Sequence, residues 1–111
     1  MRLADLDAGF VGPYADAAGA ASGTATGLQF RCPKCRETRI VVPIDPPIGP
    51  GPVDPSLNAR GILWRRTGDT VENITLTPSI DSKDVNGGYD GLPRVECHWH
   101  GFVQNGHTVD A

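Results

Sequence analysis

All three cysteines and two of the three histidines of this chain lie in two short segments, residues 31–36 and 96–101. The first segment reads Cys-x-x-Cys and the second Cys-x-x-His, and together they form a four-ligand set typical of zinc. Two residues between ligands allow a tight turn to aim both side chains at one point. We therefore predict a closed, structural Zn²⁺ site with the ligands Cys32, Cys35, Cys97 and His100.

Other chemistries fit these segments less well. Residues 97–102 resemble the second half of a Rieske motif, but a Rieske centre needs Cys-x-His in its first half, and here that half is Cys-x-x-Cys. A zinc deaminase needs His-x-Glu before its cysteine pair, and a full Cys₃His shell leaves no position for a reactive water. The remaining alternative is a reduced cysteine pair beside an unrelated His-rich turn. Since neither a serine nor a cysteine nucleophile has a recognisable setting, the sequence predicts a protein that is not an enzyme.

Composition sets further limits on function. The chain has 111 residues, enough for one domain, with a net charge of -3 and a pI of about 5.4. This acidic balance argues against nucleic-acid binding, although Arg31, Lys34, Arg36 and Arg39 surround the first cysteine pair. We interpret that basic group as a solvated hairpin tip, with docking of an acidic protein surface as the alternative. No apolar run is long enough for a membrane span, so we expect no membrane partner.

The first part of the chain is predicted to be an extended N-terminal arm, residues 1–27. Residues 15–27 are almost entirely Ala, Gly, Ser and Thr, and nothing in the arm buries enough surface to order it alone. The arm is either a floppy terminus or a segment that becomes ordered on a neighbouring subunit. In the second case its anchors are Leu3, Leu6, Phe10 and Tyr14.

The rest, residues 28–111, is predicted to be a zinc-stapled β domain. Residues 28–44 alternate as a β-hairpin with the cysteine turn at its tip, and residues 43–59 form a Pro-rich surface loop with six prolines between 43 and 55. Gly and Pro together make up more than a fifth of the chain. Outside the arm and this loop, fewer than about 80 residues remain, a size at which a metal commonly supplements the core.

Four further strands are expected. Residues 61–68 and 73–80 alternate as strands, with Trp64 in or near the core and with Ile74, Leu76 and Ile80 sharing one face. Asn105-Gly106 between short alternating runs predicts a tight hairpin over residues 102–109. The predicted fold is thus mainly β: a small antiparallel domain of the zinc-ribbon or rubredoxin-like (Rieske-like) kind.

The chain also resembles a family of small phage and prophage proteins without an assigned activity. The resemblance lies in residues 1–12, 28–35, 64–69, 75–80 and 97–106. It implies a phage origin and supports the metal site, and variation at the position of His98 among the relatives favours His100 as the ligand. From both lines we predict a non-catalytic virion structural protein, a capsid decoration or minor component.

The partners and location follow from this role. We expect contacts with other virion proteins through the arm, and a location in the virion and, during assembly, in the host cytoplasm. The alternative is a non-virion phage accessory protein that binds nucleic acid or a host protein through the ribbon; a Rieske-like electron-transfer protein comes last.

Overall fold

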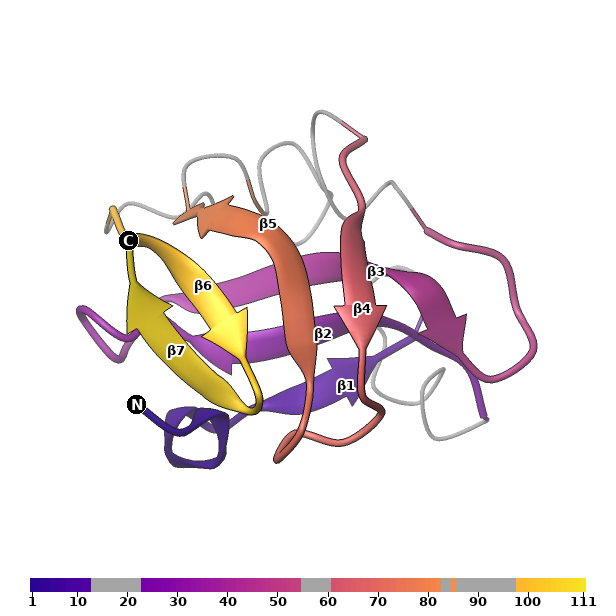
Figure 1. Cartoon of the computed structure of the whole chain (residues 1–111), viewed down its shortest axis with the longest axis horizontal. Helices are drawn as coiled ribbons and strands as arrows, with labels where there is room; N and C mark the ends of the chain where they lie inside the picture. The colour runs from indigo at the N-terminus through magenta and orange to yellow at the C-terminus, as the bar shows by residue number, and fades with distance from the viewer. Residues whose placement is uncertain (13–22, 55–60, 83–84, 86–97) are drawn as a thin grey trace.

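The computed structural model describes residues 1–12, 23–54, 61–82, 85 and 98–111. Their secondary structure is almost entirely β, as predicted, and consists of one short 3₁₀ helix and seven strands (Figure 1). The elements are η1 (Leu3–Leu6), β1 (Gly9–Val11), β2 (Ala25–Arg31), β3 (Arg39–Ile48), β4 (Trp64–Thr67), β5 (Thr75–Asp81), β6 (His100–Gln104) and β7 (His107–Asp110). The described residues contain no helix that is long and apolar enough to cross a membrane.

The seven strands form one curled sheet, a half-barrel, in which the spatial order follows the chain from β1 to β7 (Figure 1). Five of the neighbouring pairs are antiparallel, but β3 and β4 are parallel, with Ile44 opposite Trp64. Arg66 holds this junction, because its Nε donates to the Pro46 carbonyl at 2.8 Å and its Nη2 to the Pro47 carbonyl at 3.3 Å. The prediction of a purely antiparallel domain is therefore wrong, and the sheet is mixed.

The predicted hairpins are present. The cysteine turn joins β2 to β3, and Asn105 and Gly106 join β6 to β7 with φ values of 49° and 78°, as a tight turn with two positive φ angles requires. The zinc-ribbon part of the fold prediction depends on the metal and stays a prediction.

The first twelve residues belong to the sheet. Arg2 bridges to His107 of β7, the Leu3 N–H donates to the Gly106 carbonyl at 2.9 Å, and residues 9–11 pair with β2. The chain start therefore connects the β7 edge to the β1 edge. An extended arm is wrong for residues 1–12, because Leu3 and Leu6 are buried in the core rather than available to another subunit. Residues 13–22, including Tyr14, lie outside the described residues, so the boundary at residue 27 stays a prediction.

The Pro-rich segment is a strand over its first part. β3 continues through Pro43, Pro46 and Pro47 to Ile48, where the prediction placed a surface loop. This is possible because β3 pairs with β2 at Pro43 and again at Ile48, and with β4 only at Ile44 and Asp45. The missing N–H groups of prolines 46 and 47 thus fall where no ladder bond is needed. Residues 49–54 have no strand, and residues 55–60 lie outside the described part.

One apolar core fills the concave side of the sheet. It draws on η1 and on strands from both halves of the sheet, and Trp64, predicted to be in or near the core, is only 2% exposed. Its fully buried large side chains include Leu3, Leu6, Leu28, Phe30, Ile40, Ile44, Ile74, Leu76 and Ile80.

Packing of the N-terminal residues can be tested with Leu6→Ala. Since Leu6 is 1% exposed, we expect this change to lower the free energy of unfolding by about 2–5 kcal/mol, measured by urea denaturation. Val109→Ala is the control: Val109 is 43% exposed, so its truncation should cost no more than about 0.5 kcal/mol. Equal stability of the two variants would show that the first residues do not pack on the sheet.

Candidate functional site

Two three-residue segments place polar side chains together on the outer face of β5 and the start of β6. In each segment a buried apolar residue stands between two polar ones: Ile80, 0% exposed, between Ser79 and Asp81, and Trp99, 4% exposed, between His98 and His100. Because side chains alternate along extended chain, the flanking residues point away from the core. We call Ser79, Asp81, His98 and His100 the Ser–His cluster.

The central contact of the cluster joins a hydroxyl to an imidazole. The Nε2 atom of His100 lies 3.0 Å from the Oγ atom of Ser79, within hydrogen-bond distance. Ser79 is half-buried and His100 is exposed, so both remain accessible from solvent. A serine hydroxyl within hydrogen-bond reach of a histidine nitrogen is the arrangement in which the histidine can take up the serine proton.

The second contact of the cluster lies beside the first. The Nε2 atom of His98 is 3.0 Å from the Oδ1 atom of Asp81, and their side chains are 46% and 33% exposed. In the strand register Asp81 stands directly opposite His100. The Asp81 carboxylate therefore holds His98 diagonally and is the direct cross-strand neighbour of His100.

An irregularity in β5 presents Ser79. Leu76 pairs with Val103 and Ile80 with Gly101, so β5 advances four residues while β6 advances two. Pro78 lies inside this bulge, where it has no N–H to donate to a ladder. Bulges re-aim side chains next to functional sites. The buried indole of Trp64 fixes the bulged backbone, because its Nε1 donates to the Ser79 carbonyl at 3.2 Å.

Trp99 anchors the histidine segment from the core side. Its backbone N–H donates to the Ser82 hydroxyl at 2.8 Å and its indole Nε1 to the Asp110 carboxylate at 2.9 Å. Its ring also packs edge-on against Phe30, with centroids 6.0 Å apart. A side chain at Gly101 would place its Cβ 2.4 Å from the Trp99 ring and 2.5 Å from the Val109 carbonyl, so this position requires glycine. These contacts fix the two histidines on either side of Trp99.

The predicted zinc ligands are placed only in part. Cys32 is buried and Cys35 half-buried in the turn between β2 and β3, where the Thr38 N–H donates to Cys35 Sγ at 3.4 Å. This turn lies against the second predicted segment, since the Lys34 Nζ donates to the His98 carbonyl at 3.4 Å. Cys97 lies outside the described residues. Among the described ones, no three His, Cys, Asp or Glu side chains form a group that could hold a metal.

Comparison with known protein families decides between a structural and a catalytic role. Residues 14–110 match the family model described as BubE, bacterial ubiquitination-like system serine protease. The chain belongs to the BubE family. No curated protein and no solved structure matches it.

Membership in the BubE family overturns three predictions. The resemblance to phage proteins of unassigned activity is replaced by a family of bacterial serine proteases. The prediction of a virion structural protein is wrong, and so is the prediction that the chain is not an enzyme. The alternatives of a phage accessory protein and an electron-transfer protein fall with them. The expected virion partners and location, which followed from that role, stay predictions.

Ser79 and Asp81 carry no local sequence signal that marks them as functional residues when each is considered alone. Ser79 lies in the predicted strand 73–80, and the cysteine spacing assigned His100 to a metal. A usable signal was present: Ser-Ile-Asp and His-Trp-His each place an apolar residue between two polar ones. Paired as neighbouring strands, the two segments bring a hydroxyl, a carboxylate and two imidazoles onto one face.

Proposed function

We propose that this chain hydrolyses peptide-type amide bonds with Ser79 as the nucleophile and His100 as the general base. The observation that carries the proposal is the 3.0 Å contact between Ser79 Oγ and His100 Nε2. The family description, a serine protease of a bacterial ubiquitination-like system, supports the reaction class. Two serines lie in the described part of the chain, and the other one, Ser82, is buried with its hydroxyl accepting the Trp99 N–H.

The proposed reaction follows the two-step scheme of serine hydrolases. Ser79 Oγ forms a bond to the substrate carbonyl carbon while its proton passes to His100 Nε2. The tetrahedral intermediate then breaks its C–N bond, and the imidazolium of His100 gives that proton to the leaving amine. Water attacks the resulting ester by the same route, which releases the acid and restores Ser79. For this chemistry the neutral His100 carries its proton on Nδ1, leaving Nε2 as the acceptor.

Asp81 is proposed to stabilise the charge that forms on His100. Its position directly opposite His100 in the strand register places a carboxylate next to the imidazole that becomes positive. Negative charge beside the imidazolium lowers the energy of the intermediate. His98, held by Asp81 at 3.0 Å, keeps that carboxylate in place.

The assignment is tested with a fluorophosphonate probe, which reacts with activated serine hydroxyls. We expect one equivalent of probe to be bound, and peptide mass spectrometry to locate it on Ser79. Labelling of Ser22 or Ser56 instead, both outside the described residues, would move the nucleophile elsewhere.

A structural zinc remains our proposal for the cysteine turn. The contact of Lys34 with the His98 carbonyl supports it, since it brings the turn next to the residue that follows Cys97. Within the turn, the Thr38 N–H donated to Cys35 Sγ fixes the position of that sulfur. The prediction names Cys32, Cys35, Cys97 and His100 as ligands. The proposed catalytic role of His100 competes with this ligand role, because a metal-bound imidazole does not accept the serine proton.

Cys35→Ser tests the zinc proposal. We expect about one zinc per chain in the unmodified protein and a near-complete loss in the variant, measured by elemental mass spectrometry. Lys34→Gln, in the same turn but without a ligand atom, should keep its zinc. Equal metal content in Cys35→Ser and the unmodified protein would rule out this site.

A further inference from the structure

Two arginines face each other at the end of the β2–β3 hairpin. Arg31 and Arg39 are direct partners in the antiparallel register, so their side chains leave the sheet on the same face. Like charges directly opposite each other on neighbouring strands are destabilising. An anion bound between them would relieve the repulsion.

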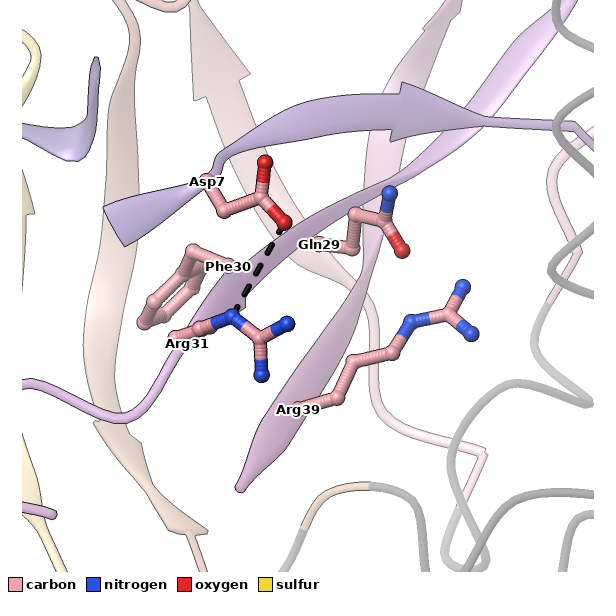
Figure 2. A pocket seen from close by; sticks show the side chains of 5 residues that line it. All are labelled: Asp7, Gln29, Phe30, Arg31 and Arg39. Atoms are coloured by element: carbon pink, nitrogen blue, oxygen red, sulfur yellow. Dashed lines mark ion pairs between the residues drawn. The ribbon is translucent and has the colours of Figure 1, made fainter. Parts of the chain in front are cut away.

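A pocket lies at this position. It has a volume of about 60 Å³ and is lined by Asp7, Gln29, Phe30, Arg31 and Arg39. A carboxylate fits this space, since one water-sized probe needs roughly 10–15 Å³. Figure 2 shows the two guanidinium groups and the Gln29 amide extending in the same direction from neighbouring strands.

One carboxylate of the chain itself, that of Asp7, already lines the pocket and makes a long ion pair there. Asp7 Oδ2 lies 3.8 Å from Arg31 Nε, and the two side chains are 80% and 48% exposed (Figure 2). An exposed pair at this distance contributes little to stability, so a better-placed carboxylate from another molecule can replace it.

The hairpin end that carries the pocket is positively charged, although the chain as a whole is negatively charged. Residues 31–39 carry four basic and one acidic side chain, a net charge of +3, in a chain whose net charge is -3. The same hairpin turn contacts the histidine segment, through Lys34 and the His98 carbonyl at 3.4 Å. The positive end of the hairpin therefore adjoins the element that carries His100.

We propose that Arg31 and Arg39 bind a carboxylate in an acidic segment of a peptide substrate, and that Asp7 competes with it from within the chain. Paired guanidinium groups suit a carboxylate because each presents a planar fork of donors. The inference rests on the proposed function in one respect only, that the bound peptide is a substrate.

Binding is measured in the Ser79→Ala variant, so that no cleavage is required and the result does not depend on the nucleophile assignment. The probes are two fluorescently labelled peptides, one rich in Glu and the other with Gln at the same positions, followed by fluorescence anisotropy. We expect the Glu peptide to bind about 10-fold more tightly than the Gln peptide or better, as charge-assisted hydrogen bonds predict. Adding Arg31→Gln and Arg39→Gln should abolish this preference.

Asp7→Asn provides a test with the opposite sign. Asp7 has a φ of 52°, a conformation that Asn also adopts, so the backbone is preserved. Removing the internal competitor should tighten binding of the Glu peptide about 2- to 5-fold. Arg65→Gln, which removes an exposed positive charge on β4, should leave the affinity unchanged.

Several results would overturn the proposal. These are equal binding of the two peptides, a Glu preference that survives loss of both arginines, or an equal loss in Arg65→Gln. The proposal is also overturned if Asp7→Asn binds the Glu peptide more weakly. It is overturned as well if inorganic phosphate displaces the Glu peptide at a lower concentration than acetate does. Should the double arginine variant fail to fold by circular dichroism, the Asp7→Asn result decides.

Discussion

Ser79→Ala is expected to lose hydrolytic activity by about 10³-fold or more, because the nucleophile of the two-step reaction is removed. Turnover of an activated ester and the rate of fluorophosphonate labelling both measure this loss. The substitution removes one hydroxyl from a half-buried position and leaves the backbone contact from Trp64 to the Ser79 carbonyl available. The fold should therefore survive, with a thermal unfolding midpoint close to that of the unmodified protein.

Two other serines, Ser22 and Ser56, are the controls for this prediction. Ser22→Ala and Ser56→Ala should retain activity within about 2-fold, since neither residue is assigned a role in the proposed reaction. Retained activity in Ser79→Ala would refute the assignment of the nucleophile, and a loss confined to one of the two control variants would identify the residue that replaces it.

His100→Gln is expected to lower activity by about 10²- to 10⁴-fold, the range for removal of a general base. Gln keeps a polar side chain of similar length, but its amide cannot take up the serine proton. Fluorophosphonate labelling should slow by a similar factor. His98→Gln is the control from the same segment: His98 contacts Asp81 rather than Ser79, so we expect a smaller loss, about 10-fold at most.

The zinc content of His100→Gln separates the two roles assigned to this residue. If His100 is the base, the variant is inactive and its zinc content equals that of the unmodified protein. If His100 is a ligand, the variant loses zinc, as Cys35→Ser is expected to do. Loss of zinc from His100→Gln would thus exclude the base assignment, because the imidazole would be occupied by the metal.

Local sequence patterns predicted the hairpins and most strands after residue 28, but neither β1 nor the way the sheet closes. The Asn105-Gly106 turn and the alternation at Ile74, Leu76 and Ile80 are short-range signals, and the structure contains both. The parallel pairing of β3 with β4 depends on contacts of Arg66 with a distant strand. Docking of Leu3 and Leu6 likewise depends on a core supplied by other strands. In both cases the contacting residues lie far away in the sequence, so local patterns do not reveal the contact.

The candidate site was harder to predict for a related reason. The Ser79–His100 contact joins residues from two strands whose register is shifted by the bulge at Pro78. The register before the bulge, continued from the Leu76–Val103 pair, would place Ser79 opposite His100, whereas the register after the bulge places Asp81 there. Nothing in the spacing of the chain gives the size of this shift. The cysteine spacing, by contrast, is a local pattern, and because of it His100 was predicted to be a metal ligand.

The parallel step from β3 to β4 has a consequence for how this protein can vary. Two strands that run in the same direction cannot be joined by a tight turn, so the connection between Ile48 and Trp64 is a crossover. Lengthening such a crossover adds little entropic cost, because closure entropy grows only with the logarithm of loop length. Neither Ser79 nor His100 lies in it. We expect homologues to differ in length here, and it is the place at which a foreign module can be inserted without silencing the enzyme.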